Sequence, residues 1–182
     1  YGYSKFISWQ FRNLKKKGLI VQGSHPVGWC PQDQNPVSQH DTVGDIEPEL
    51  IEYVLVKFKF EEQYVIPTAT LRPETIFGVT NLWINPDIKY VIAQVNKEKW
   101  IITKEAARKL EFLNASVSII SEIDGSDLIG KSVFDETRRQ LVPMFPASFV
   151  DPNNGTGIVM SVPAHSPYDY QALVDLKKDD NN

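Results

Sequence analysis

The sequence has almost none of the features that mark a secreted, redox or membrane protein. Its 182 residues include a single cysteine, Cys30, which excludes an internal disulfide and fits a reducing cytosol. No apolar run approaches the roughly 18 residues that a membrane-spanning helix needs. The first residues lack the basic and apolar regions of a signal peptide, and they lack an initiator methionine. We therefore expect a segment from inside a longer cytoplasmic protein, with no membrane contact.

An excess of positive charge is also missing. The chain carries 19 Lys and Arg against 23 Asp and Glu, a formal net charge of −4. This balance argues against a protein that binds nucleic acid mainly by bulk charge. The two local basic clusters, at residues 15–17 and 138–139, are more typical of solvated helix ends than of a phosphate track. An RNA substrate would have to be recognised by a specific site.

Several common catalytic signatures are absent. The sequence has no phosphate-cradling glycine-rich loop and no nucleophile-elbow pattern. A metal could draw on His25, Cys30, Asp33 and His40. Asp33, however, stands where a zinc knuckle would place its second cysteine, and no second cysteine pair follows. We predict no metal site and no cofactor.

The composition that remains, 42% hydrophobic and 23% charged, is typical of a globular domain with a sizeable core. A helix is predicted from Ser4, as its N-cap, to Lys17, followed by a short strand at residues 19–21. Residues 23–50 are rich in Gly, Pro, Asp, Asn and Gln, which indicates an irregular connector. We place a domain boundary here, between residues 1–50 and residues 51–182.

Beyond the connector the pattern is mainly that of short strands. Apolar residues alternate with polar ones in the first of them, as expected of a half-buried strand. A helix start is indicated by Ser166, Pro167 and Asp169, in the cap, first and third positions. Strands are expected at 54–60, 64–66, 90–95, 100–103, 117–120, 141–150 and 158–162, and helices at 104–110 and from 167 to about 178. This pattern predicts an α+β fold, a barrel-like β domain with a few short helices.

Two segments are chemically unusual for plain scaffold. Residues 68–75 place three threonines, an arginine and a glutamate around Pro73 at a strand end. They either line a small polar pocket or form a bulged loop whose hydroxyls satisfy their own backbone. Residues 155–169 end on Asp169, which is either a helix-capping carboxylate or a receptor for a substrate ammonium group. From the residues alone, both alternatives stay open for each segment.

Together these segments resemble the editing (connective polypeptide) domain shared by leucyl-, valyl- and isoleucyl-tRNA synthetases. Residues 70–75 are similar to the threonine-rich signature of that family, and residues 155–165 with Asp169 and Tyr170 to its second signature. The isoleucyl enzymes carry a Trp-containing first signature, which is missing here, and the valyl enzymes continue differently after the shared Arg-Pro-Glu-Thr. Residues 80–83, Thr-Asn-Leu-Trp, and residues 24–31 resemble leucyl enzymes of the archaeal and eukaryotic branch.

The resemblance implies a function. A leucyl-type editing domain hydrolyses the ester of tRNA(Leu) mischarged with isoleucine, methionine, valine or norvaline, by attack of a water without a covalent intermediate. Its partners would be the 3′ end of that tRNA and the rest of the synthetase chain, with residues 1–50 forming the edge of the catalytic fold and the connector. The two nucleotide-binding signatures of class I synthetases are absent, so no aminoacylation is expected from this chain alone. Alternatives are a valyl-type editing domain and a non-catalytic RNA-binding or scaffold domain.

The resemblance also implies residue roles. Thr70, Thr75 and Asp169 would be catalytic, with Asp169 binding the free α-ammonium. Ser166 departs from the second Asp of bacterial relatives, so Asp169 alone carries that role. The substrate-binding residues would be Thr70, Leu71, Arg72, Glu74, Thr75, Val159, Met160, Ser161, His165 and Asp169.

Overall fold

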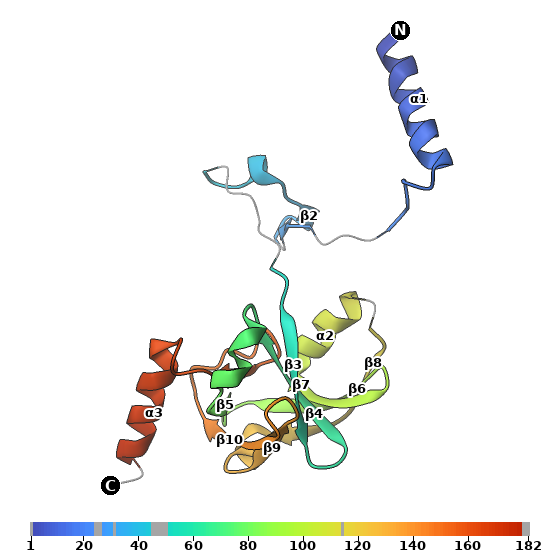
Figure 1. Ribbon diagram of the computed structural model, residues 1–182. Coiled ribbons are helices and arrows are strands. Elements are labelled where there is room, and N and C mark those ends of the chain that lie inside the picture. The colour runs from blue at the N-terminus through green and yellow to red at the C-terminus, as the bar shows by residue number, and fades with distance from the viewer. Residues whose placement is uncertain (1, 24–26, 31, 45–50, 114, 180–182) are drawn as a thin grey trace. The chain divides into compact units, whose positions relative to one another are not determined.

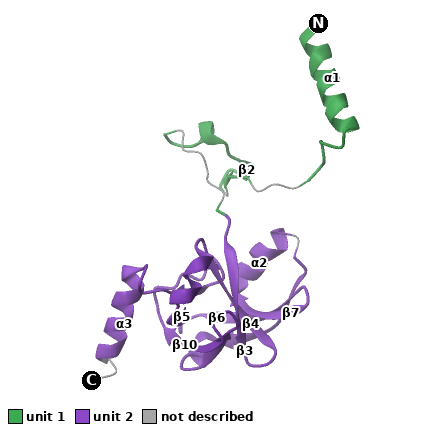
Figure 2. Cartoon of the chain, in the orientation of Figure 1, with its two compact units in different colours: residues 1–51 green, residues 52–182 purple. Residues whose placement is uncertain are grey.

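The computed structural model describes residues 2–23, 27–30, 32–44, 51–113 and 115–179. They divide into two compact units, Tyr1–Ile51 and Glu52–Asn182 (Figure 2). The connector residues at which we place the domain boundary lie partly outside the described residues, as does His25, one of the four side chains considered and rejected for a metal site. Each unit is described by itself.

Among the residues of the first unit that the structure describes, one long helix is the main regular element. It consists of α1 (Gly2–Lys16), a short antiparallel pair of β1 (Trp29–Cys30) and β2 (Asn35–Pro36), and a 3-10 turn, η1 (Gln39–Asp41). The predicted helix is confirmed, but Ser4 lies inside it rather than at its cap. The strand predicted at residues 19–21 is wrong. An isolated apolar triplet gains nothing from extended pairing without a partner strand, and Leu19 and Val21 are exposed.

The second unit is built around one large sheet (Figure 1). Within the part of the chain that the structure describes, nine strands follow the order β11-β5-β10-β9-β3-β4-β7-β6-β8. The β10–β5 and β4–β7 pairs are parallel and the other pairs antiparallel. The elements are β3 (Val54–Phe60), β4 (Tyr64–Thr70), η2 (Pro73–Gly78), β5 (Asn81–Ile84), β6 (Lys89–Val95), β7 (Glu98–Thr103), α2 (Lys104–Phe112), β8 (Val117–Asp124), η3 (Gly125–Leu128), β9 (Ser132–Asp135), β10 (Gln140–Pro146), β11 (Ile158–Ser161) and α3 (Pro167–Asp179).

The predicted α+β class is confirmed, with one difference in the closure of the sheet. A barrel needs hydrogen bonds between its first and last strands. Here the two edge strands, β11 and β8, do not pair with each other, and β8 is largely exposed. The sheet is therefore open.

The alternating pattern of β3 and the strands predicted at residues 90–95 and 100–103 are confirmed, and the latter two, β6 and β7, form an antiparallel hairpin. Phe58 and Phe60 are buried in the main core while Lys57 and Lys59 are exposed. Asn96 turns the hairpin with a φ of 53°, a conformation that Asn tolerates. The sequence reasoning missed β5 and β9. All four residues of β5 are buried, so this strand shows no alternation of polar and apolar residues.

The strand β10 is shorter than predicted. It ends at Pro146, because the chain then turns: the Ala147 N–H donates to Ile84 O at 2.8 Å, and the Val150 N–H donates to Ala147 O at 3.3 Å. The strand β8 is longer than predicted and runs to Asp124.

The loop before β11 is fastened to the body of the sheet by buried hydrogen bonds. The Tyr90 hydroxyl donates to Gly157 O at 2.9 Å and accepts from the Asn85 N–H at 3.1 Å. Gly157 has a φ of +75°, and a Cβ there would lie 2.1 Å from Thr103 Cγ2, so only glycine fits. The Thr103 N–H also donates to Thr156 O at 3.1 Å. These contacts fix where β11, and the site beyond it, begins.

Removing the Tyr90 hydroxyl should destabilise the fold. Tyr90→Phe leaves a buried carbonyl and a buried N–H unpaired, so the free energy of unfolding in urea should fall by about 1–3 kcal/mol. The control Tyr168→Phe removes a hydroxyl from a highly exposed side chain. It should change the free energy of unfolding by less than about 0.5 kcal/mol. Equal effects of the two variants would contradict this role.

The same contact has a pH dependence. Burial raises the pKa of Tyr90 to about 12 in the folded chain, against about 10 for an unfolded tyrosine. The contribution of the protonated Tyr90 hydroxyl to the free energy of unfolding is therefore complete below about pH 10, and it is lost as the pH rises toward 12. The stability difference between wild type and Tyr90→Phe should shrink across that interval.

Candidate functional site

The two chemically unusual segments meet through the pairing of β5 with β11. In this antiparallel pair Asn81 is opposite Ser161 and Trp83 is opposite Val159. The Thr80 N–H donates to Ser161 O at 3.1 Å. The segment that follows β4 is thereby held beside the one that leads into α3.

Contacts within the first segment are local. The Thr70 hydroxyl accepts from the Arg72 N–H at 3.1 Å, and Arg72 Nε forms an ion pair with Glu74 Oε1 at 2.9 Å. Thr75 is buried, and both its hydroxyl and its N–H donate to Arg72 O, at 2.7 and 3.1 Å. These bonds close η2 behind Pro73. Thr70 and Thr75 therefore do satisfy their own backbone, and that same bonding fixes the Thr75 side chain, whose χ1 is stiff.

Glu74 connects the two segments electrostatically. Its own backbone N–H, then the Arg72 guanidinium and, most weakly, an electrostatic interaction with His165 hold the pKa of the Glu74 carboxyl below its usual value. Glu74 and His165 are exposed, so this interaction is screened by water. It nevertheless places His165, from the second segment, near the first.

Asp169 is the buried acid of the site, with 7% of its surface exposed. Its Oδ1 accepts from the Trp83 indole N–H at 2.9 Å, and its Oδ2 accepts from the Val162 N–H at 2.9 Å. The Asp169 N–H donates to the Ser166 hydroxyl at 3.3 Å, which confirms Ser166 as the helix cap. In a full capping box the Ser166 N–H would also donate to the side chain of Asp169. This second bond is not formed, because the Ser166 N–H donates to Val162 O instead. Asp169 therefore does more than cap its own helix.

A small polar cluster lies next to this acid. The Thr80 hydroxyl donates to Asn81 Oδ1 at 2.8 Å and lies 3.4 Å from the Ser161 hydroxyl. Asn81 Nδ2 is buried and has no hydrogen-bond partner among the described residues. Since side chains two residues apart share a face of a strand, this unpaired donor lies on the face of β5 that also carries Trp83.

The predicted substrate-binding residues of β11 do not all lie on one face. Val159 is partly exposed and shares a face with Ser161, whereas Met160 belongs to the main hydrophobic core. Leu71 is exposed. Ser161 directly precedes Val162, whose N–H donates to Asp169, whereas Thr70 and Thr75 make their hydrogen bonds within the first segment and Met160 lies in the core.

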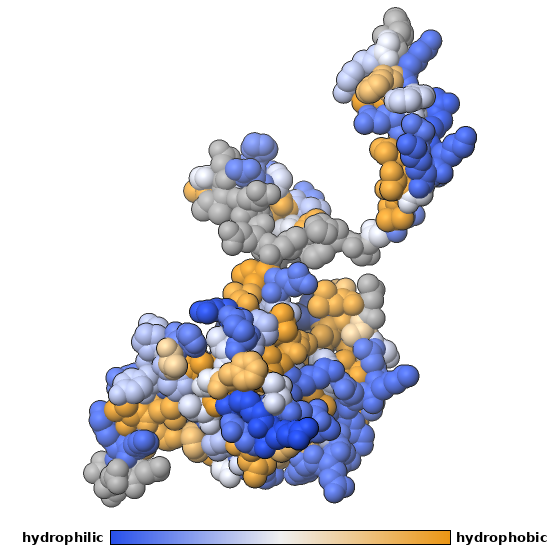
Figure 3. Space-filling view, viewed as in Figure 1, coloured by the Kyte–Doolittle hydropathy of each residue, from blue (hydrophilic) through white to orange (hydrophobic). Residues whose placement is uncertain are grey.

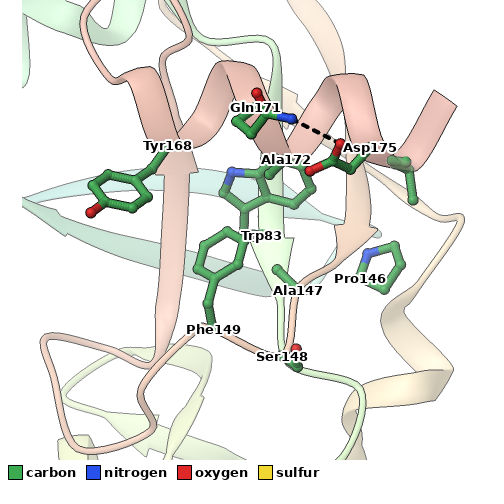
Figure 4. A pocket seen from close by; sticks show the side chains of 10 residues that line it. Trp83, Pro146, Ala147, Ser148, Phe149, Tyr168, Gln171, Ala172 and Asp175 are labelled. Atoms are coloured by element: carbon green, nitrogen blue, oxygen red, sulfur yellow. Dashed lines mark hydrogen bonds between the residues drawn. The ribbon is translucent and has the colours of Figure 1, made fainter. Parts of the chain in front are cut away.

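Two clefts border this region. One of about 190 Å³ is lined by Tyr53, Ala69, Phe149, Asn154 and Val159, among others. The other, of about 470 Å³, lies beneath α3 and is lined by Trp83, Phe149, Tyr168 and Ala172, among others (Figure 4). Apolar side chains gather on the surface beside α3 (Figure 3).

Trp83 is the residue that the sequence reasoning missed. In the sequence analysis Trp83 counted only as part of the family resemblance, although the chemistry of its side chain pointed to a hydrogen-bond partner. A buried tryptophan needs a partner for its N–H, and Asp169 is the buried acid that provides one.

The first unit offers little for a metal. The Cys30 thiol donates to Asp33 Oδ2 at 3.4 Å. Among the described residues, no group of three or more His, Cys, Asp or Glu side chains is placed to hold an ion. This observation does not test the whole chain, and the absence of zinc stays a prediction. No helix in the described ranges is long and apolar enough to cross a bilayer.

Comparison with known proteins identifies the family. The family described as "Leucyl-tRNA synthetase, editing domain" matches residues 52–177. Leucine--tRNA ligase of Pyrobaculum calidifontis is 52% identical over 174 residues, covering 96% of this chain, and that of Methanococcoides burtonii is 54% identical over 178 residues, covering 96%. The chain spans only 18% of the length of each relative.

Solved structures share the fold. The crystal structure of GlLeuRS-CP1 has a TM-score of 0.64 at 28% identity, covering 69% of this chain and 60% of that one. The cytosolic leucyl-tRNA synthetase editing domain of P. knowlesi has a TM-score of 0.63 at 15% identity, covering 71% and 64%. The predicted leucyl assignment, over the valyl alternative, is confirmed: this chain belongs to the leucyl-tRNA synthetase editing-domain family.

Proposed function

We propose that this chain hydrolyses the ester bond of tRNA(Leu) mischarged with isoleucine, methionine, valine or norvaline, as the post-transfer editing domain of a leucine--tRNA ligase. Such a step is needed because one methylene in a hydrophobic pocket separates substrates by only ~1–3 kcal/mol, a limit that applies to aminoacyl-tRNA synthetases in general. The observation that carries the proposal is the buried carboxylate of Asp169, which is hydrogen-bonded to Trp83 of β5, the strand that follows the threonine-rich turn.

Asp169 is suited to bind the α-ammonium of the mischarged amino acid. An ionised carboxylate has about four acceptor positions. Trp83 and Val162 occupy one on each oxygen, which leaves positions for an ammonium donor. The N-terminus of α3 favours the negative charge, and the low local dielectric strengthens its attraction to a cation.

The chemistry is a direct hydrolysis. A water oxygen attacks the ester carbonyl carbon, the bond from that carbon to the ribose oxygen breaks, and the ribose oxygen takes up a proton. The hydrogen bond from the Arg72 N–H occupies a lone pair of the Thr70 hydroxyl and leaves the Thr70 proton for the substrate or the water. Free amino acid and uncharged tRNA are released, without a cofactor.

The remaining residues would shape the site. Thr75 would exclude leucine, with Leu71 beside it, while Arg72 and Glu74 support the turn. Val159, Ser161 and His165 would face the terminal nucleotide, and Met160 would support that wall from the core.

The wider setting is part of the same proposal. Residues 1–50 would be the edge of the catalytic fold and the connector, and residues 51–182 the editing domain, in a cytoplasmic synthetase. The partners would be the tRNA(Leu) 3′ end and the rest of that chain. Without nucleotide-binding signatures, this chain alone should not aminoacylate.

Asp169→Asn should abolish most editing. Losing one partner of a desolvated ion pair costs about 3–5 kcal/mol, so deacylation of isoleucyl-tRNA(Leu) should slow by about 100-fold or more. The stability cost should be smaller for Asn than for Ala, because Asp169→Ala leaves the Trp83 and Val162 donors both unpaired.

The matched control is Glu105→Gln, which neutralises an acid in the first turn of α2 and should leave the rate unchanged. Full activity of a folded Asp169→Asn chain would reduce Asp169 to a structural residue. No hydrolysis by the wild-type chain would favour the alternative of a non-catalytic RNA-binding or scaffold domain.

Thr75 should determine selectivity through its methyl group. Thr75→Ser keeps the hydroxyl that donates to Arg72 O but removes the methyl, so the chain should begin to hydrolyse correctly charged leucyl-tRNA. Thr75→Val keeps the branched shape and loses that hydrogen bond, so it should still spare leucyl-tRNA while losing about 1 kcal/mol of stability. Thr75→Tyr should fill the pocket and stop all editing.

The measurement for Thr75 is deacylation of leucyl-tRNA(Leu) and isoleucyl-tRNA(Leu), side by side, for wild type and the three variants. The proposal is wrong if Thr75→Ser spares leucyl-tRNA(Leu) as wild type does. In that case Thr75 would only close the turn at Pro73.

A further inference from the structure

The indole N–H of Trp83 and the carboxylate of Asp169 form a buried hydrogen bond between residues 86 positions apart. Trp83 is 1% exposed, and Oδ1 of Asp169 lies 2.9 Å from its nitrogen. A hydrogen bond to a charged acceptor is shorter and stronger than a neutral one. The sheet thus contributes a fixed donor to the one buried acid of α3 that the proposed chemistry uses.

The indole ring is held rigidly. Trp83 lies on β5, between β10, where its partner is Phe145, and β11, where its partner is Val159. Its ring makes an edge contact with Phe149 at 5.7 Å between centroids and a tilted contact with Phe145 at 6.4 Å. Figure 4 shows the indole beneath α3, with its nitrogen toward the helix. A donor on a strand that is paired on both sides holds its direction better than one on a loop.

We propose that Trp83 is a positioning residue for editing: through its N–H it fixes the orientation in which the Asp169 carboxylate meets the substrate ammonium. This inference rests on the proposed function. Trp83 itself does not touch the substrate.

The physical reason is the freedom of a carboxylate about its last torsion, which is broad and has no sharp minima. One donor, the Val162 N–H on Oδ2, leaves the plane of the carboxylate free to turn. The second donor, on Oδ1, defines that plane and directs the remaining lone pairs. Without the Trp83 donor, the ammonium would compete for a carboxylate of variable orientation.

The plainer alternative is that Trp83 only fills the core and that its N–H takes the nearest acceptor. Both readings predict lower activity for a Trp83 variant, so a rate alone does not separate them. They differ in what a variant does to the recognition of the ammonium group. A packing defect slows all substrates equally, whereas a misdirected carboxylate affects only substrates that carry the ammonium.

The test compares two substrates, isoleucyl-tRNA(Leu) and its deaminated analogue, in which nitrous acid has replaced the α-ammonium by a hydroxyl. The readout is the ratio of their kcat/KM values. Trp83→Phe keeps an aromatic ring and removes the N–H. The matched control is Trp100→Phe, since Trp100 is also buried and its N–H donates to a carboxylate oxygen of Glu98 at 2.8 Å, away from β5 and α3.

Wild type should prefer the substrate that carries the ammonium group. Trp83→Phe should lower that preference about tenfold, which is the scale of one hydrogen bond to a charged group. Trp100→Phe should leave the preference unchanged. An unchanged preference in Trp83→Phe overturns the positioning role. If Trp83→Phe does not fold, benzothienylalanine at position 83, with sulfur in place of the N–H, decides by the same ratio. Absence of hydrolysis by wild type would instead contradict the proposed function, so the two failures are distinguishable.

Discussion

The carboxylate of Asp169 is withdrawn from water at the place where β5, β11 and the start of α3 meet, and a buried charge of this kind is tolerated only when donors surround it. Trp83 and Val162 supply those donors, and the dipole of α3 favours the negative charge in its first turn. Each comes from a different element, so the position of the acid depends on the pairing of β5 with β11 and on the helix cap at Ser166. The strand order of the sheet therefore also determines where the acid of the site lies.

The threonine-rich turn is held to the same framework from the other side. Thr75 is fixed by the carbonyl of Arg72, and the chain after the turn hydrogen-bonds to Ser161 of β11 through Thr80. Arg138 adds a further support, since its guanidinium donates to Val79 O at 2.7 Å while paired with the buried Asp135. The turn and Asp169 are thus each tied by hydrogen bonds to strands of one sheet, which would suit the proposed site, because it must separate amino acids of similar size.

Much of this arrangement could be predicted from the sequence. The alternation around Phe58 and the Ser166–Pro167–Asp169 helix start gave the strand β3 and the helix α3, because periodicity and capping are local signals. The strand β5 could not be found in this way, since all its residues are buried. The partnership of Trp83 with Asp169 and the open edge between β11 and β8 depend on tertiary pairing, which no local pattern carries. The isolated triplet Leu19–Val21 shows the opposite error, a strand-like pattern without a partner.

The central claim is that the Asp169 carboxylate binds an α-ammonium group. It is tested most directly by nuclear magnetic resonance of the ¹⁵N-labelled chain, titrated with an amide-linked, hydrolysis-resistant isoleucyl-adenosine. Our account predicts that the Trp83 indole and Val162 amide resonances shift on binding, because both N–H groups donate to the oxygens that receive the ammonium. The matching compound with a hydroxyl in place of the ammonium should leave those two resonances nearly unmoved. Equal shifts with both compounds, or binding that leaves both resonances unchanged, would contradict the claim.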